Sequence, residues 1–347
     1  MKPLELSPEH FRALAADVIA LSAEYLLTLD SRSVFPRTNG AETERLFGEE
    51  VPEHGMGDRA FDALSDVMAH SRAENGRFFG YVKGSGEPVA ALGDLVTSIL
   101  NQNTTAWRSS PAAVTIECTV VRWLGEAVGC HGFSGSLTGG GSAANLMGLA
   151  MARESRIPAN DCGIRNAGVG VVYASDQVNM AVPKAVALLG IGRENLHFVP
   201  CDDSYCMVPT ELERAIRADE AHGRKPMAVV ASAGTVNTGS IDPLPEIAAI
   251  ARAHQLWMHV DGAYVALAAI AVLQKFAGLA QADSLSLDPH NGCISPSIAD
   301  VSCTATPELP ELRLATPAAM RNSSVLTQSK ASRSLKSLWN FPVAFAH

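Results

Sequence analysis

The alternation of short apolar runs with amphipathic segments constrains the fold of this chain more than any other feature. Four runs are almost continuously apolar, as in strands that are buried on both faces of a sheet: 168–175, 195–200, 227–234 and 256–264. Helical spacing of apolar residues marks the stretches that separate or flank them: 143–155, 183–191, 209–223 and 243–255. This alternation predicts an α/β protein with a mostly parallel sheet and helices on both faces. Its functional site is expected where the strands end.

The N-terminal segment predicts a separate amphipathic helix. Ser7 is a suitable N-cap, Pro8 suits the first helical position, and apolar residues then recur at helical spacing to about residue 29. A single helix of this kind cannot bury its apolar stripe, so it is expected to pack on the main body or on a second subunit. We therefore assign residues 1–45 to an N-terminal helical arm and residues 46–290 to one large domain.

The composition excludes several classes of protein. With 347 residues, 47% of them hydrophobic and 18% charged, the chain predicts a globular protein with a large core. Its net charge of −9 argues against nucleic acid or an anionic membrane as a partner. The seven cysteines lack zinc-site spacing, which predicts free thiols, no metal site and a cytoplasmic location. We expect neither a secretory signal nor a membrane span.

A glycine-rich turn, GSLTGGGS at 135–142, precedes one of the predicted helices. Glycines let the backbone approach a ligand closely, and a helix N-terminus presents free N–H groups to an anion. The turn lacks both the Gly-Lys-Ser/Thr of a Walker A loop and the GxGxxG spacing of dinucleotide sites. An anion cradle and an ordinary tight turn both remain open for this segment.

Two polar segments follow predicted strands and have simple structural interpretations. In SDQVNMAVPKA (175–185), Ser175 or Asp176 is expected to cap a helix. In SAGTVNTGSIDPLPEIA (232–248), Thr235 lies just beyond a strand and Asp242 is expected to cap the next helix. Neither segment by itself predicts more than a turn.

Asp261, in HVDGAY (259–264), points more clearly to a function. It follows an apolar strand, so its carboxylate is expected to be buried, which is costly unless a partner compensates it. A cationic ring nitrogen is such a partner, and enzymes that use pyridoxal phosphate pair an Asp with the pyridinium nitrogen of the cofactor. A structural Asp held by backbone amides is the alternative.

Taken together and in this order, the segments resemble the fold-type I pyridoxal-phosphate enzymes, and within them the group II amino-acid decarboxylases. RFFGYV (77–82), LNQNTTAWRSSPAAVTIE (100–117) and DSLSLDPH (283–290) add to a likeness that extends over about residues 5–290. The resemblance implies a fold-type I large domain, pyridoxal phosphate as cofactor and conversion of an L-amino acid to its amine. It also implies a homodimer with the site near the subunit interface.

The resemblance assigns roles residue by residue. Gly141 and Ser142 match the phosphate-binding turn, and Thr235 matches a cofactor contact. Asp261 matches the partner of the ring nitrogen, and Ala263 matches a residue against the ring.

Three positions depart from the family pattern, and the first is Ala143, where the family usually has a Glu after the phosphate-binding serine. Asn179 stands where the family has a ring-stacking histidine. His290 matches the residue before the Schiff-base lysine, but the lysine position itself is Asn291. An amide is not a nucleophilic amine and cannot replace that lysine. We do not expect any lysine of the chain to substitute for it: Lys2, Lys83, Lys184, Lys225, Lys275, Lys330 and Lys336.

Residues 291–347 differ in character from the rest of the chain. They contain nine Ser, four Thr and five Pro but one of the 28 Gly, and they show no clear periodicity. Reverse translation with chosen synonymous codons yields the family-like text WLYQPLDCG one base out of frame, directly after a restored lysine codon. We therefore interpret 291–347 as a frameshifted tail that replaces the rest of the large domain and a C-terminal small domain.

The expected function is decarboxylation of an L-amino acid, impaired or lost in this chain because of Asn291. One alternative is a non-catalytic remnant that binds pyridoxal phosphate or pairs with an intact homologue. Another is a nucleotide-binding α/β protein that uses the glycine-rich turn. The sequence does not select among amino-acid substrates.

Overall fold

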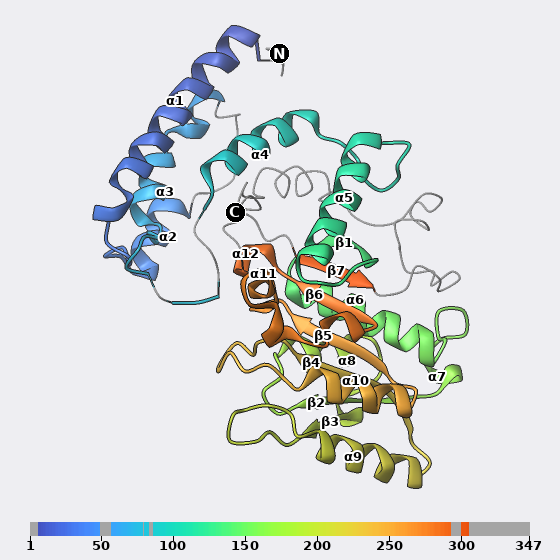
Figure 1. The fold of residues 1–347 in the computed structure, drawn as a ribbon. Helices are drawn as coiled ribbons and strands as arrows, with labels where there is room; N and C mark the ends of the chain where they lie inside the picture. The colour runs from blue at the N-terminus through green and yellow to red at the C-terminus, as the bar shows by residue number, and fades with distance from the viewer. Residues whose placement is uncertain (1–5, 49–56, 79, 83–85, 293–299, 305–347) are drawn as a thin grey trace. The chain divides into compact units, whose positions relative to one another are not determined.

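The computed structural model describes residues 6–48, 57–78, 80–82, 86–292 and 300–304 (Figure 1). The chain divides into two units, Met1–Tyr81 and Val82–His347. The predicted boundary between arm and large domain, at 45/46, lies inside the first unit. Most of the predicted tail lies outside the described residues, and its described parts are 291–292 and 300–304.

The first unit is helical. Its elements are α1 (Pro8–Thr28), η1 (Leu29–Ser31), α2 (Gly40–Phe47), η2 (Gly57–Phe61) and α3 (Leu64–His70). The predicted start of α1 is confirmed, because the Ser7 side chain accepts a hydrogen bond from the His10 N–H and Pro8 opens the helix. The segment that follows α1 is held by Asn75, whose Nδ2 donates to the carbonyls of Leu29 and Arg32 at 2.9 and 3.0 Å.

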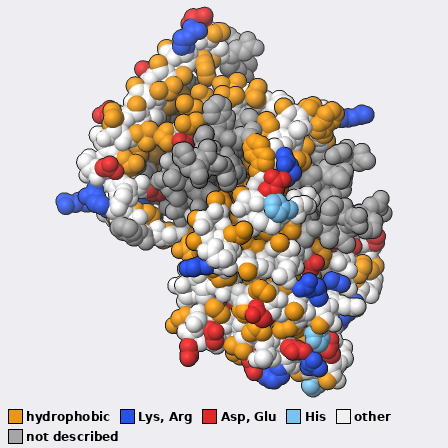
Figure 2. All heavy atoms as spheres, in the orientation of Figure 1, with side chains coloured by type: hydrophobic (Ala, Val, Ile, Leu, Met, Phe, Trp, Pro, Cys, Tyr) orange, Lys and Arg blue, Asp and Glu red, His pale blue; other side chains and the backbone are white. Residues whose placement is uncertain are grey.

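Helix α1 leaves its apolar stripe uncovered within the described residues. None of its residues is buried, and Ile19 is 50% and Leu27 86% exposed. Figure 2 shows apolar side chains, in orange, along the helix. Since burial of an apolar stripe is the main source of stability for such a helix, α1 needs a partner surface.

The second unit is built on one seven-stranded sheet with the order β1-β7-β6-β5-β4-β2-β3. The strands are β1 (Ser134–Thr138), β2 (Gly170–Ser175), β3 (Leu196–Val199), β4 (Lys225–Ser232), β5 (Trp257–Gly262), β6 (Ser284–Leu287) and β7 (Asp300–Thr304). Neighbouring strands from β6 to β3 are parallel, and β7 is antiparallel to both β1 and β6. The predicted α/β fold with a mostly parallel sheet is confirmed, and the four apolar runs form β2, β3, β4 and β5.

Helices cover both faces of this sheet. The helices of this unit are α4 (Pro88–Leu100), α5 (Pro111–Ala127), α6 (Gly141–Arg156), α7 (Ile164–Ala167), α8 (Ala181–Leu188), α9 (Pro209–Ala221), α10 (Leu244–Ala253), α11 (Ala269–Val272) and α12 (Pro289–Gly292). Four short 3-10 turns complete the unit: η3 (Arg193–Asn195), η4 (Ala266–Ala268), η5 (Leu273–Phe276) and η6 (Leu279–Gln281). No helix among the described residues is long and apolar enough to span a bilayer.

Two hydrophobic cores lie on opposite faces of the sheet, as the alternation along β4 shows. Val229 belongs to the core that contains Ile216 of α9. Its neighbour Val230 belongs to the core that contains Leu149 of α6 and Val182 of α8. Because successive side chains of a strand point to opposite faces, a strand buried on both faces must be apolar throughout. This is the pattern that the sequence showed.

Both predicted helix caps are wrong. Helix α8 begins at Ala181 with Met180 as its N-cap, several residues after Ser175 and Asp176. Helix α10 begins after Pro243 without a side-chain cap. Instead, the buried Asp242 carboxylate accepts backbone N–H bonds from Met207 and Ser232, both at 2.7 Å. These bonds join the end of β4 to the loop before α9, a contact between distant segments that no pattern in the sequence indicates.

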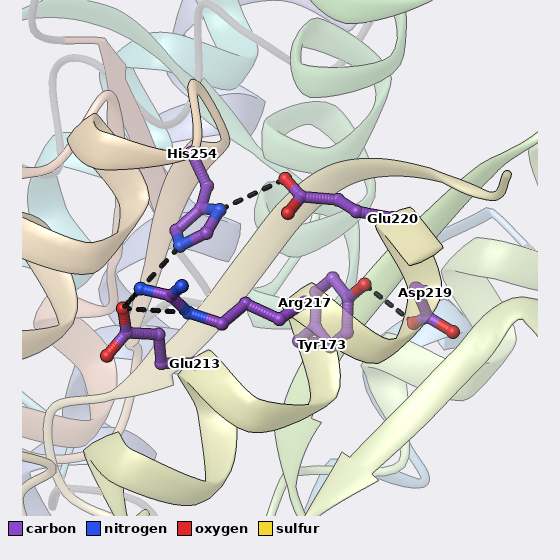
Figure 3. A network of polar contacts seen from close by, with 6 residues as sticks. All are labelled: Tyr173, Glu213, Arg217, Asp219, Glu220 and His254. Atoms are coloured by element: carbon purple, nitrogen blue, oxygen red, sulfur yellow. Dashed lines mark hydrogen bonds and ion pairs between the residues drawn. The ribbon is translucent and has the colours of Figure 1, made fainter. Parts of the chain in front are cut away.

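A polar cluster attaches α9 to the sheet (Figure 3). Tyr173 of β2 is fully buried, and its hydroxyl donates to Oδ2 of Asp219 at 2.7 Å. Arg224 donates to the other Asp219 oxygen at 3.0 Å. Burial and the neighbouring carboxylate both raise the pKa of Tyr173, so the phenol stays protonated and continues to donate.

Replacing Tyr173 with Phe should therefore lower the free energy of unfolding by about 1–2 kcal/mol, because the buried Asp219 oxygen loses a donor. Urea unfolding followed by circular dichroism measures this change. The matched control is Arg217→Ala, which removes the exposed Arg217–Glu213 pair on the same helix and should have no measurable effect. Equal effects of the two substitutions would contradict the role given to the Tyr173 hydroxyl.

Candidate active site

A cavity of about 270 Å³ opens where β4 and β5 end and α6 begins. Seven of the eight residues predicted for the site line it: Gly141, Ser142, Asn179, Thr235, Asp261, Ala263 and Asn291. The eighth, His290, is not among the lining residues, and its N–H donates to Oδ1 of Asp288 at 2.8 Å. Residues far apart in the sequence thus meet at one edge of the sheet.

The sheet register explains why they meet. Asp261 on β5 pairs with Ser232 on β4 and with Ser286 on β6. These three strands are parallel, so their carboxyl ends lie side by side, and the polar residues there face a common space. Gly234 lets the chain turn directly after β4. Its φ of 106° suits glycine, and a Cβ there would lie 2.4 Å from Cβ of Val265.

The N-terminus of α6 supplies the second wall. Gly140 stands at the N-cap with φ 136° and makes no side-chain cap, and Gly141 and Ser142 follow as the first helical residues. The first N–H groups of a helix lack intrahelical acceptors and carry the positive end of its dipole. Since Gly141 and Ser142 line the cavity, this wall suits a phosphate group.

Asp261 is the buried anion of the site, only 9% exposed. It accepts hydrogen bonds from Asn145 Nδ2 at 2.9 Å and from the Ala263 N–H at 3.3 Å, and Ser286 Oγ lies 3.2 Å from Oδ1. Burial nevertheless raises the pKa of Asp261 against the effect of these bonds. None of the ion pairs among the described residues includes it.

A carboxylate in this position would be stabilised by a cation inside the cavity. Among the residues that the structure describes, one backbone amide, that of Ala263, reaches the Asp261 carboxylate, so the alternative of a structural Asp held by backbone amides explains little of its environment. The phosphate-binding wall and the buried anion fit the phosphate and the ring nitrogen of pyridoxal phosphate, respectively. The residues on these two walls therefore fit the noncovalent contacts of that cofactor.

The lysine that would bind the cofactor covalently is absent from the predicted position, which is Asn291. Asn291 lies in α12, lines the cavity, and donates from Nδ2 to the Ala263 carbonyl at 3.2 Å. None of the described lysines lines the cavity: Lys184 lies in α8, Lys275 in η5, and Lys225 donates to the Arg156 carbonyl. Lys2, Lys83, Lys330 and Lys336 lie outside the described residues.

Thr235 and Asn179 shape the remaining wall. Thr235 is buried, its N–H donates to the Ser240 carbonyl at 3.0 Å, and its Oγ1 lies 3.0 Å from Ser240 Oγ. Asn179 uses its Oδ1 to accept the Ala181 N–H at 2.9 Å. Its side chain therefore holds the start of α8, and it presents no aromatic ring to a ligand.

Asn145 was not among the predicted site residues, although it lines the cavity and contacts Asp261. One signal was available, because Asn145 is a polar residue one turn into an otherwise apolar helix that follows the glycine-rich turn. Ser284 and Ser286 were not predicted either, although two serines at alternate positions of an apolar strand point to the same face.

Comparison with known proteins decides the family. Residues 54–307 match the profile described as the pyridoxal-dependent decarboxylase conserved domain. An aromatic-L-amino-acid decarboxylase of Bacillus atrophaeus is 31% identical over 315 residues, which cover 86% of this chain and 62% of that protein. The chain belongs to the pyridoxal-dependent decarboxylase family. The family resemblance predicted from the sequence is confirmed.

Other members of the family agree. A tyrosine decarboxylase of Oryza sativa subsp. japonica is 32% identical over 304 residues, covering 83% of this chain and 57% of that protein. The crystal structure of mouse CSAD has a TM-score of 0.85 at 25% identity and covers 96% of this chain and 73% of that chain. The chain thus spans about three fifths of the length of these curated decarboxylases. The profile match ends at residue 307, inside the predicted tail.

His259 should give this family member a recognisable dependence of stability on pH. Burial lowers the pKa of His259 from 6.5 to about 4, so the folded chain keeps it neutral while the unfolded chain takes up a proton below pH 6.5. The stability that it contributes is therefore complete above pH 6.5 and is lost as the pH falls to about 4. The loss amounts to about 3 kcal/mol.

Urea unfolding of the parent chain and of His259→Gln at pH 7 and pH 4 isolates this contribution. Buried carboxyls such as Asp261 titrate in both proteins, so the difference between them reports His259. We expect that difference to change by about 3 kcal/mol, with the parent losing more stability in acid. A difference that is independent of pH would contradict the neutral, buried state of His259.

Proposed function

We propose that this chain binds pyridoxal phosphate noncovalently in the cavity, and that it derives from a decarboxylase of L-amino acids whose reaction it no longer completes. One observation carries the proposal. The cavity is lined by the buried Asp261 carboxylate and by Gly141 at the N-terminus of α6, but the residue at position 291, where the family has its lysine, is an asparagine. The family membership and the similarity to aromatic-amino-acid decarboxylases support the substrate class.

Each wall of the cavity has a task in the proposed complex. The N–H groups of Gly141 and Ser142 would hold the phosphate, and Asp261 would hold the ring nitrogen in its protonated form. When bound, the cofactor supplies the electron sink that stabilises the carbanion left by departing CO₂. Thr235 and Ala263 would confine the ring, and the burial of Thr235 would help to exclude water from it.

Asn291 limits what the chain can do with a bound substrate. Its amide nitrogen is not nucleophilic and already donates to the Ala263 carbonyl, so it neither anchors the cofactor nor displaces a product from it. It also lacks a group that could carry a proton at this side of the cavity. We therefore expect binding without efficient turnover.

A homodimer is part of the proposal. Helix α4 exposes six large apolar side chains, each 39–59% exposed: Val89, Leu92, Leu95, Val96, Ile99 and Leu100. A contiguous apolar surface on a soluble protein usually marks an interface, and a second copy of this chain is the partner that we propose. The alternative is a non-catalytic subunit that pairs with an intact homologue, and mass spectrometry of the purified assembly distinguishes the two.

Substituting Asn291 with Lys should restore covalent attachment of the cofactor. We expect the Asn291→Lys variant, incubated with pyridoxal phosphate and reduced with borohydride, to gain one cofactor mass at position 291. Decarboxylation of a panel of L-amino acids should rise by at least about 100-fold, since an activated nucleophile is restored.

The matched control is Asn291→Gln, which lengthens the side chain but keeps an amide and should gain neither property. Turnover by the unsubstituted chain equal to that of Asn291→Lys would contradict the proposal, as would a cofactor adduct on the Gln variant.

We further propose that residues 291–347 are translated from a shifted reading frame. The absent lysine and the change in composition after residue 290 support it. Sequencing the source DNA across codon 291 tests it, and the expected result is one missing base whose restoration reads His-Lys-Trp. An unbroken frame with an asparagine codon, and no family-like text in another frame, would refute it.

A further inference from the structure

A run of four hydrogen bonds leads from β5 through β6 and α6 back to the carboxylate of Asp261. Trp257 Nε1 donates to Ser284 Oγ at 2.8 Å, and Ser284 Oγ lies 2.8 Å from His259 Nδ1. His259 Nε2 lies 2.8 Å from Asn145 Oδ1, and Asn145 Nδ2 donates to Asp261 Oδ2 at 2.9 Å. All five residues are buried, and His259 and Ser284 are wholly inaccessible to solvent.

With Asp261 ionised, the chemistry of the groups gives every bond in this run a direction. A carboxylate only accepts, so Asn145 must turn its NH₂ group to Asp261 and its carbonyl oxygen to His259. That oxygen only accepts, so His259 carries its proton on Nε2, and its Nδ1 accepts from the Ser284 hydroxyl. Ser284 in turn accepts from the indole N–H of Trp257. Every donor points toward Asp261.

The packing around His259 holds its ring against Asn145. Gly148 lies on α6 at the point where the ring passes, and a Cβ there would lie 2.4 Å from both Cε1 and Nδ1 of His259. Any larger residue would push the ring away from Asn145. The ring is therefore enclosed between the sheet and α6, where its nitrogens contact the side chains of Ser284 and Asn145 and the backbone of Ser284 also interacts with the ring.

Ser286 cannot replace His259 in this role. Its hydroxyl lies 2.9 Å from Asn145 Oδ1 and 3.2 Å from Asp261 Oδ1. A hydroxyl has a single proton, so Ser286 serves only one of these acceptors at a time. His259 is the partner whose N–H is committed to the Asn145 oxygen.

We propose that His259 is a positioning residue for the cofactor site, and that its Nε2–H locks the Asn145 amide with the NH₂ group on the Asp261 carboxylate. It does not line the cavity and acts only through Asn145. Locked in this way, the Asp261 carboxylate is aimed at a ring nitrogen. Without the lock, the amide rotates and brings an oxygen to the carboxylate. The inference rests on the proposed binding of pyridoxal phosphate in this cavity.

The test compares two ligands that differ at one atom: pyridoxal phosphate and its analogue with carbon in place of the ring nitrogen. Equilibrium binding of each is measured for the unsubstituted chain, for His259→Gln and for His259→Met. Gln keeps an N–H donor near the position of Nε2, whereas Met has a similar size and no donor. We expect the unsubstituted chain to prefer pyridoxal phosphate by about tenfold or more, as a charge-assisted hydrogen bond implies.

The preference should survive in His259→Gln and fall to less than about threefold in His259→Met. A residue that merely supports the fold would weaken both ligands equally and leave the preference unchanged, so an unchanged preference in His259→Met overturns the inference. If His259→Met does not fold, Gly148→Ala, which displaces the ring without altering a polar group, must show the same loss, and an unchanged preference there overturns the inference as well.

Binding of the two ligands to the unsubstituted chain shows whether the role of His259 fails or the proposed function itself fails. If that chain binds neither ligand, the proposed function fails and the inference fails with it. If it binds both equally, pyridoxal phosphate still occupies the chain, but the role given to Asp261 and His259 is overturned.

Discussion

A carboxylate buried without a cationic partner is the constraint on which the site depends. Asp261 is 9% exposed and receives three polar contacts, yet burial still raises its pKa, and no described ion pair neutralises it. A protein core tolerates such a group only where hydrogen bonds or a charged partner offset the cost of its burial. The run of donors from Trp257 to Asn145 and the open cavity beside Asp261 supply the two parts of that arrangement.

The parallel sheet makes the arrangement possible. Because β4, β5 and β6 run in one direction, Ser232, Asp261 and Ser286 reach the same edge, and the N-terminus of α6 lies at that edge as well. The negative group and the positive helix end therefore face one cavity from different walls. Asn291 completes the same cavity but carries no chemistry that would make it reactive.

The sequence predicted the elements better than their contacts. Continuous apolar runs identified β2 to β5, because strands buried on both faces tolerate no polar alternation. The positions after those strands identified Thr235 and Asp261, since ligands gather at the carboxyl ends of parallel strands. The resemblance then supplied Gly141, Ser142, Asn179, Ala263 and Asn291, which line the cavity, and His290, which does not.

The partners of these residues could not be predicted in the same way. Asn145, His259 and Ser286 act through contacts across 25 or more positions of sequence, and such contacts follow from sheet register and helix packing. Asp242 illustrates the same limit. Its position before a helix predicted a cap, but tertiary structure gave its carboxylate two backbone N–H donors elsewhere.

A crystal structure of the unsubstituted chain grown with pyridoxal phosphate tests the central claim most directly. We predict density for the cofactor in the cavity, with its ring nitrogen on Asp261, its phosphate on the N–H groups of Gly141 and Ser142, and no bond to Asn291. An empty cavity, or a cofactor held with its phosphate away from α6 and its ring nitrogen away from Asp261, would contradict the claim.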